Sequence, residues 1–344
     1  DDSTFAMEGP ICTGPYAVES FNPTDSCVVV KNENYWDGEV PLDKVTLKCV
    51  DDQTTRSMAL QTGEIDIAYN LKTEDLIEFE GNDNYEIQEL QSLRSTYAFM
   101  NQSEGRALSD KALRQALLRG LDKQTYCDVL LEGGATAGKA PVPPTLDFGF
   151  DDLNDENSYD PEGAKKLLDD AGIVDTDGDG IRELDGQNIN LHYVSYENRL
   201  LNDFSNAHIQ YLAEIGIGCT ADYGSSDDQW SKLAAGDYDF NNNNWITVGT
   251  GDPYAYMANW ATDTTYCGYS NPEYDALFEQ LKSEMDEDKR ADLIFQMQQI
   301  LVDDAAVLID GYCNSSMIYS KNVGNAHIHT ADYYWLTTEI TPAQ

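Results

Sequence analysis

The chain has 344 residues, and its 62 acidic residues against 21 Lys and Arg give a formal net charge of −41 at pH 7. This charge nearly excludes a nucleic-acid-binding protein, because phosphate contacts need clustered Lys and Arg. A hydrophobic content of 41% is ample for real cores, and the length predicts two domains at about 100 to 200 residues each.

Targeting and cysteine signals are sparse. No apolar run approaches the roughly 20 residues of a membrane span, and Asp1 to Thr4 lack the charged-then-apolar pattern of a signal peptide. Either a targeting segment has been removed or none existed. The seven cysteines have no C-x-x-C spacing, which argues against a zinc ribbon, and their odd number means that they cannot all pair within the chain. An acidic surface with few Lys favours a protein working outside a cell.

The first hundred residues predict short strands and helices in alternation. β-branched runs and period-two alternation indicate strands at 27–31, 45–50 and 65–69. A helix is predicted at 53–62, closed by Gly63 as a left-handed cap, and a second at 73–79 with Thr73 as its N-cap.

The rest of the chain is more helical. Apolar residues at three- and four-residue spacing, flanked by capping residues, predict helices that begin near Ser109, Asp160, Asn198, Gln229, Asn271 and Asp286. Strands are predicted again at 317–320 and 326–330. Residues 240–260 are rich in Asn, Gly and aromatics, and this composition predicts a loop after Trp245 that presents backbone and ring faces to a partner.

One acidic segment resembles half of a calcium loop. Asp175, Asp177 and Asp179 offer oxygen ligands at alternate positions, but position twelve, where a bidentate Glu is expected, is Gly186. Glu183 or Asp185 could substitute. A low-affinity calcium site and a plain acidic turn are both open interpretations.

Catalytic motifs are missing from the sequence. The four histidines are too few for a confident metal site, and no nucleophile elbow, P-loop or Rossmann glycine pattern occurs. Carboxylate pairs carry no information in a chain this acidic. The sequence therefore predicts a protein that is not an enzyme and needs no cofactor.

Five segments together resemble one family. They are Gly-Pro-Tyr at 14–16, Asn-Tyr-Trp at 34–36 with the following Pro-Leu-Asp, the helix and strand at 59–66, the helix at 108–123, and the Tyr-Asp-Pro helix at 159–172. In this order and spacing they resemble the dipeptide, oligopeptide and nickel solute-binding proteins of ABC importers, extracellular solute-binding family 5. Gly-Asp-Tyr-Asp before Trp245 and Tyr-Ser-Asn-Pro at 269–272 extend the likeness over most of the chain.

The resemblance implies an α/β fold of the type II periplasmic-binding-protein class, with two lobes joined by a hinge and closing on a ligand. In the family the Gly-Pro-Tyr segment follows a long part of the first lobe, so the first lobe is expected to be incomplete and the chain alone to bind ligand poorly. By the same comparison, residues 1–99 form part of lobe one, 100–311 form lobe two and 312–344 return to lobe one. The hinge strands are expected at 97–100 and 312–315.

The resemblance also implies ligand-binding positions. The Trp and Gly-Asp-Pro segment places Trp245, Gly251, Asp252 and Tyr254 at the ligand, and Gly249 stands where peptide-binding members have an acid for the peptide amine. Arg199 is the nearest match to the arginine that holds a peptide carboxylate, and Arg94 is a further candidate.

The implied function is the extracytoplasmic substrate-binding component of an ABC importer. Its expected partners are a small solute, such as a peptide or metal chelate, and the permease subunits; it is expected to be a monomer that binds no nucleic acid. The expected location is the periplasm or, as a lipoprotein, the surface of a bacterium. The alternatives are a secreted carbohydrate-active enzyme and a calcium-dependent adhesion module.

Overall fold

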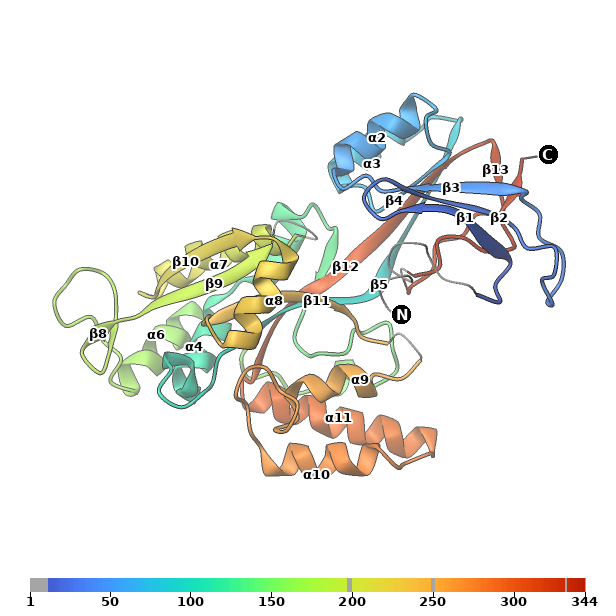
Figure 1. Ribbon diagram of the computed structural model, residues 1–344. Coiled ribbons are helices and arrows are strands. Elements are labelled where there is room, and N and C mark those ends of the chain that lie inside the picture. Colours follow the sequence, from blue (N-terminus) through green and yellow to red (C-terminus); the bar gives the residue numbers. More distant parts are fainter. Residues whose placement is uncertain (1–11, 197–199, 249–250, 332, 344) are drawn as a thin grey trace. The chain divides into compact units, whose positions relative to one another are not determined.

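The computed structural model describes residues 12–196, 200–248, 251–331 and 333–343 (Figure 1). The chain divides into two compact units, unit 1 up to Leu90 and from Asn314, and unit 2 from Gln91 to Cys313. Both boundaries fall inside long neighbouring strands, β5 (Tyr85–Met100) and β12 (Val307–Ser320). The division into lobes at 1–99, 100–311 and 312–344 stays a prediction. Among the described helices, none is long and apolar enough to span a membrane.

Unit 1 contains an antiparallel sheet in the order β1 (Tyr16–Asn22), β2 (Ser26–Lys31) and β3 (Lys44–Lys48). The chain continues through α2 (Gln53–Gln61), β4 (Ile67–Tyr69), α3 (Thr73–Leu76) and η1 (Ile77–Phe79). β4 pairs antiparallel with the last part of β12. A small core joins these elements through Leu60, Ala68, Phe79 and Ile318. The strands β13 (Val323–Gly324) and β14 (Thr341–Pro342) form a separate pair.

Unit 2 is built on strands in the order β10 (Gly218–Gly224), β9 (Asn190–Tyr196), β11 (Phe240–Ile246), β5 and β12, with β6 (Ala135–Ala137) along β12. The strands β9, β10 and β11 are parallel to one another, whereas β5 runs antiparallel to β11. The short strands β7 (Glu183–Leu184) and β8 (Gln187–Asn188) form a hairpin of their own.

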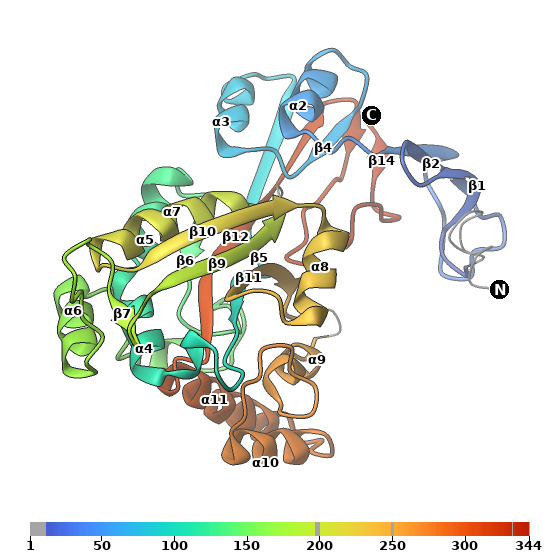
Figure 2. The same ribbon diagram turned by 60° about the vertical axis from the view of Figure 1, so that its left-hand side comes forward.

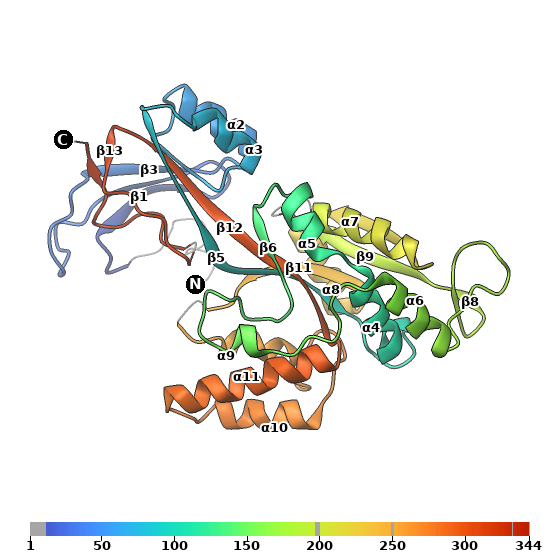
Figure 3. The ribbon, with the colours of Figure 1, turned by 180° about the vertical axis from the view of Figure 1, so that it is seen from behind.

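Helices cover both faces of this sheet. One face carries α4 (Lys111–Gly120), α6 (Pro161–Asp170) and α7 (Leu201–Glu214). The other carries α8 (Ser226–Ala235), α9 (Tyr254–Met257), α10 (Pro272–Leu281) and α11 (Glu287–Asp303), and the last two pack side by side (Figures 1 and 3). Shorter turns complete the unit: η2 (Ala107–Ser109), α5 (Lys123–Thr125), η3 (Tyr126–Leu130), η4 (Phe150–Asp152) and η5 (Ala258–Trp260).

The alternation of side chains along β5 explains the two buried faces. Tyr97 and Phe99 pack into the cluster beneath α9, α10 and α11, whereas Ala98 and Met100 pack beneath α4 and α7. Successive side chains of a strand point to opposite faces, so a strand covered on both sides reads as one continuous apolar run. Tyr97 meets the fully buried Trp260 edge to face at 5.9 Å between ring centroids.

Several predicted elements are confirmed with their caps. The helix at 53–62 is α2, and Gly63 follows it with a φ of +73°. Asp160 caps α6, because its carboxylate accepts a hydrogen bond from the Gly163 N–H at 2.9 Å, and Pro161 occupies the first turn. The strands at 27–31 and 45–50 are β2 and β3, within two residues.

Two predicted helix starts and one predicted strand are wrong. Thr73 does not cap α3, since Lys72 holds the N-cap position without a side-chain hydrogen bond. α8 begins at Ser226 and not at Gln229, because Ser225 caps a polar first turn that carries no apolar signal. Residues 326–330 form no strand.

The side chain of Gln88 explains the missing strand at 326–330. Its amide nitrogen donates to the Ala326 carbonyl at 2.9 Å, and its amide oxygen accepts from the Ile328 N–H at 2.8 Å. A side chain therefore takes the place of a neighbouring strand.

Candidate ligand-binding site

The carboxyl ends of β9, β10 and β11 meet at one edge of unit 2. After β9 the chain passes through α7 to β10, which lies on one side of β9. After β10 it passes through α8 to β11, which lies on the other side of β9. α7 and α8 lie on opposite faces of these strands (Figures 2 and 3). In open α/β sheets, ligands bind outside the carboxyl ends of the strands where the strand order reverses. The edge formed by Tyr196 and Ile246 is therefore the candidate site.

Polar side chains link three strands at this edge. The side-chain amide of Asn244 on β11 donates to the Tyr196 hydroxyl at the end of β9. The Asn244 amide oxygen accepts from Nη1 of Arg94 on β5, a strand that pairs Arg94 with Ile246. A phenol, an amide and a guanidinium are thus joined in one hydrogen-bonded chain. Such groups fix the orientation of a bound polar molecule.

Trp245 is a second aromatic residue at the edge, next to Asn244 in β11. Its side chain is 37% exposed, whereas the residues at 240–243 of the same strand are buried. A partly exposed indole can stack on a flat group of a ligand and donate a hydrogen bond through its N–H.

Buried amides hold β11 in place below Trp245. Gln229 of α8 is fully buried, and its side-chain nitrogen donates to the Asn242 carbonyl and to the Asn243 amide oxygen, both at 3.0 Å. The Asn242 amide in turn donates to the Ser205 hydroxyl of α7 at 2.6 Å. These bonds tie β11 to α8 and α7, while Gln229 Oε1 and Asn242 Oδ1 have no hydrogen-bond partner among the described residues. The Asn-rich run is therefore strand interior, and the loop begins after Ile246.

A match to a family model identifies the protein family of this chain. Residues 1–266 match the model of the bacterial extracellular solute-binding proteins, family 5, described as its middle region. The chain belongs to this family. The family predicted from the sequence motifs is thereby confirmed.

Among curated relatives, the haem-binding protein A of Haemophilus influenzae is 32% identical over 47% of the chain. The nickel-binding periplasmic protein of Escherichia coli is 30% identical over 54% of the chain. These matches span only 29% and 36% of the relatives' own lengths.

Solved structures of family members give the fold. The oligopeptide-binding protein AppA of Bacillus subtilis, in complex with a nonapeptide, superposes with a TM-score of 0.86 at 24% identity, covering 100% of this chain and 69% of that one. NikA of Brucella suis, in complex with Fe(III)-EDTA, gives a TM-score of 0.84 at 21% identity, covering 97% and 68%. The type II periplasmic-binding-protein fold is confirmed.

The residues after Trp245 have partners within the protein. Tyr254 stacks on Phe278 of α10 with 5.0 Å between parallel rings, so one face of its ring is used in packing. Gly251 has a φ of +90°, a conformation that only glycine adopts without strain. Asp252 accepts a hydrogen bond from the Tyr254 N–H at 2.8 Å and lies 2.7 Å from Nε of Arg290.

These contacts set the protonation of Asp252. Burial raises the pKa of its carboxyl, but the hydrogen bonds from Arg290 and Tyr254 outweigh burial and hold the pKa below its ordinary value. Asp252 is therefore ionised and already paired with a cation. Arg199 and Gly249, the other two positions implied by the family resemblance, lie outside the described residues.

Tyr196 and Asn244 were missed by sequence reasoning. Tyr196 ends a strand of mixed polar and apolar residues, and Asn244 lies in a run of four asparagines in which nothing distinguishes one member from another. Only the pairing of β9, β11 and β5 brings both side chains to Arg94.

The acidic segment forms a closed turn. Oxygen atoms of Asp175, Asp177 and Glu183 lie within 4.8 Å of one another, and Asp179 is not part of this group. Asp175 accepts hydrogen bonds from the N–H groups of Gly178 and Gly180, and these bonds lower its pKa. Glu183 accepts from the N–H and hydroxyl of Thr176 at 2.8 and 2.7 Å. The calcium interpretation of Asp175, Asp177 and Asp179 stays a prediction.

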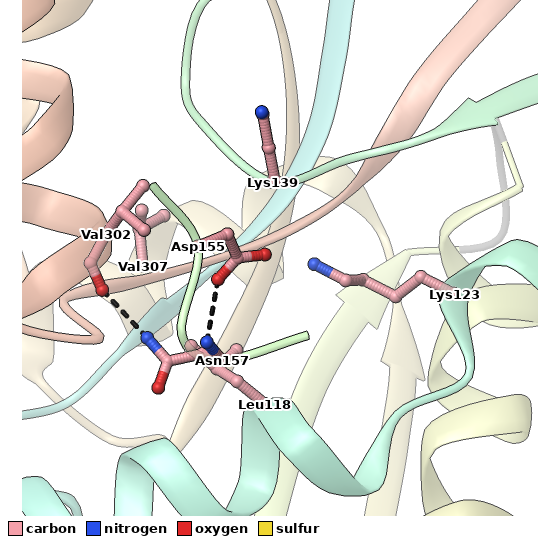
Figure 4. A pocket seen from close by; sticks show the side chains of 7 residues that line it. All are labelled: Leu118, Lys123, Lys139, Asp155, Asn157, Val302 and Val307. Carbon is pink, nitrogen blue, oxygen red and sulfur yellow. Dashed lines mark hydrogen bonds between the residues drawn. The ribbon is translucent and has the colours of Figure 1, made fainter. Parts of the chain in front are cut away.

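A small pocket elsewhere in unit 2 is lined by Leu118, Lys123, Lys139, Asp155, Asn157, Val302 and Val307 (Figure 4). Its Lys123, Lys139 and Asn157 side chains donate to backbone carbonyls. Lys123 donates to the carbonyls of Gly138 and Ile309, and burial lowers its pKa. Asn157 donates to the Val302 carbonyl at 2.9 Å. We assign this pocket to the packing of unit 2.

Proposed function

We propose that this protein is the extracytoplasmic substrate-binding component of an ABC importer. It captures a peptide or related small solute and delivers it to the membrane permease, without catalysing a reaction. The observation that carries this proposal is the family match over residues 1–266. The relatives named above are binding proteins for haem, nickel and peptide, which supports solute binding and leaves the choice of solute to experiment.

Within unit 2, the proposed ligand surface is the edge that carries Arg94, Tyr196, Asn244 and Trp245. Its support is the reversal of strand order at β9, the hydrogen bonds that join Arg94, Asn244 and Tyr196, and the partly exposed Trp245 that follows Asn244 in β11. Gly249, Gly251, Asp252, Tyr254 and Arg199 remain proposed as ligand positions from the family resemblance alone. Of these, Asp252 would meet a ligand as one half of an ion pair with Arg290.

The proposed setting follows from the family name. An extracellular solute-binding protein works outside the cytoplasmic membrane, as a monomer in the periplasm or as a lipoprotein on the cell surface, and its partners are permease subunits. The strong negative charge of the chain is compatible with solubility there.

Ligand-dependent thermal stabilisation tests the function. The purified chain is mixed in separate wells with a random tripeptide library, glutathione, haem and a nickel–histidine chelate, and its Tm is measured by scanning fluorimetry. We expect one class to raise the Tm, because a ligand that binds only the folded state stabilises it, and to do so only at high ligand concentration, since the chain alone is expected to bind poorly. A hit is then incubated with the protein and examined by mass spectrometry, and recovery of chemically unchanged ligand is expected. Conversion of the ligand into a product would overturn the proposal of a non-catalytic receptor.

A further inference from the structure

Five Asp-Gly pairs occur in the chain. They are Asp37-Gly38, Asp177-Gly178, Asp179-Gly180, Asp185-Gly186 and Asp310-Gly311. In such a pair the backbone nitrogen of the glycine can attack the side-chain carboxyl carbon of the aspartate, since glycine has no Cβ to hinder the approach. The reaction needs a carboxyl group and an N–H that are both free to turn toward each other. The surroundings of each pair therefore decide whether it can react.

Asp310-Gly311 is restrained by burial and by strand pairing. The Asp310 side chain is fully buried, and its carboxylate lies 3.0 Å from Nε2 of His208. The Asp310 carbonyl accepts a hydrogen bond from the Gly138 N–H at 3.1 Å, and Gly311 pairs with Ala137 of β6. Ring closure here would have to break this pairing inside the core of unit 2.

The two pairs of the acidic turn are restrained by a shared acceptor. The Gly178 N–H donates to Oδ1 of Asp175 at 2.6 Å, and the Gly180 N–H donates to Oδ2 of Asp175 at 2.9 Å. The Asp177 carboxylate is engaged as well, because it accepts a hydrogen bond from the Asp179 N–H at 3.1 Å. Both glycine nitrogens are thus directed away from the carboxyl groups that they would attack.

Asp185-Gly186 is restrained as the two-residue loop of the β7–β8 hairpin. Both residues have a positive φ, +53° and +74°, as a type I′ turn requires. Leu184 and Gln187 pair directly on either side of the loop. Ring closure has to rotate the peptide unit between Asp185 and Gly186, and this rotation would break the pairing of the hairpin.

Asp37-Gly38 has none of these restraints. Both residues are exposed in a bend between β2 and β3, and neither makes a hydrogen bond or an ion pair with any described residue. A Cβ built on Gly38 would meet no atom within 4 Å, so the space around its backbone is open. The pair is therefore free to bring the Gly38 nitrogen to the Asp37 carboxyl group.

We propose that Asp37 is a modification site at which the chain isomerises to isoaspartate. The Gly38 nitrogen forms a bond to Cγ of the protonated Asp37 carboxyl group, and the amide proton and the carboxyl hydroxyl leave as one water molecule. Water then opens the resulting succinimide ring. Attack at Cγ restores aspartate, whereas attack at the backbone carbonyl leaves the chain running through Cγ and frees the α-carboxylate. One water is released and one is consumed, and no electrons are transferred.

The product has a main chain that is longer by one methylene between Trp36 and Val40. Trp36 is 77% exposed, and Val40, at 3%, is where the connection becomes buried again. The added atom lies in the exposed part of this connection, so the modified protein is expected to stay folded. This inference does not depend on which solute binds, and its failure would leave the proposed function untouched.

The test is incubation of the intact folded chain at mildly acidic pH, where protonated carboxyl groups can release water, followed by trypsin digestion and mass spectrometry. The tryptic peptide that ends at Lys44 contains Asp37-Gly38 and no other Asp-Gly pair. Electron-transfer fragmentation identifies isoaspartate, and the succinimide is seen as a peptide lighter by one water. We expect isoaspartate at Asp37 to accumulate about tenfold faster than at the other pairs, because their hydrogen bonds must first be broken.

Incubation in guanidinium chloride removes the structural restraints, so the rates of the five pairs should then become similar. Asp37→Glu should abolish the modified peptide, because glutamate would have to close a larger ring. Asp177→Glu, an exposed aspartate of another pair, is the matched control and should leave the rate at Asp37 unchanged. Equal rates at Asp37 and at Asp177, Asp179 or Asp185 in the folded chain would overturn the proposal. So would isomerisation of Asp37 that occurs in guanidinium chloride alone.

Discussion

At the scale of single residues, Trp245 and Trp230 are a matched pair, exposed by 37% and 38%. Trp245 lies on the proposed ligand edge, whereas Trp230 of α8 contacts Tyr266 at 6.2 Å between ring centroids. We expect Trp245→Ala to weaken binding of the solute found by thermal screening by more than about 1 kcal/mol, because a desolvated ring face typically contributes that much. Isothermal titration measures the effect. Trp230→Ala should bind normally, and equal losses in both variants would contradict the assignment of the edge.

The stability cost of Trp245→Ala separates a binding role from a core role. Truncation of a buried tryptophan costs about 3 to 5 kcal/mol, which we expect for the fully buried Trp260. Trp245→Ala should cost clearly less in urea unfolding. If both variants unfold alike, Trp245 is structural.

The Asp252–Arg290 pair predicts a pH-dependent stability difference. The folded-state pKa of Asp252 lies below its ordinary value of about 3.9, so the pair stabilises the fold above about pH 4, and this contribution is lost as pH falls through the folded-state pKa. Asp252→Asn should lower the Tm at neutral pH by the equivalent of about 1 kcal/mol or less, since the pair is partly exposed.

The difference between Asp252→Asn and the unchanged chain should shrink in acid, where the carboxyl is protonated and neutral like the amide. Removal of any negative charge also relieves repulsion in a chain with a net charge of −41, so the exposed Asp37→Asn serves as the control for that effect. A Tm difference that stays constant from neutral to acid pH would show that the ion pair contributes nothing.

At the scale of elements, local signals predicted the helices well and the central strands poorly. Asp160-Pro161 and Gly63 report on their own turns, and their caps are confirmed. Most of β5, β9 and β11, by contrast, is defined by neighbours distant in sequence. The same dependence hides the candidate site, since Arg94 and Asn244 meet only because β5 pairs with β11. The Gln88 side chain bonds the backbone of Ala326 and Ile328 in place of a neighbouring strand, and the spacing of apolar residues cannot predict this either.

The acidic turn at 175–186 is an element whose affinity can be predicted. Position twelve is Gly186, which has no bidentate carboxylate, and the Glu183 carboxylate is already hydrogen-bonded to Thr176. We expect a calcium dissociation constant no tighter than roughly millimolar, as in the weakest calcium loops. Isothermal titration with calcium measures it, with Asp177→Ala as the test variant and Asp151→Ala as a control outside the turn. Micromolar binding that Asp177→Ala abolishes would contradict this prediction.

At the scale of the whole molecule, the order of motifs was more informative than any single one. Gly-Pro-Tyr at 14–16 or Gly-Asp-Tyr-Asp at 236–239 is common in isolation. The order of these motifs along the chain nevertheless predicted the family and the fold that the comparisons confirm. Composition could not do this, because charge and apolar content set solubility and core size and leave topology open. The residues that choose the solute are also beyond the reach of motif order, because the named family members bind chemically different ligands.

The net charge of −41 leads to a prediction about salt. Like charges repel more strongly in the compact fold than in the expanded unfolded chain, so screening should stabilise the fold. The Debye length falls from about 30 Å at 0.01 M to about 8 Å at 0.15 M salt, and only to about 3 Å at 1 M. Most of the increase in Tm should therefore occur below about 0.15 M, with NaCl and KCl giving the same curve. A Tm that is flat in this range and rises only at molar salt would instead indicate exclusion of salt from the protein surface, and a difference between the two cations would indicate a specific ion site.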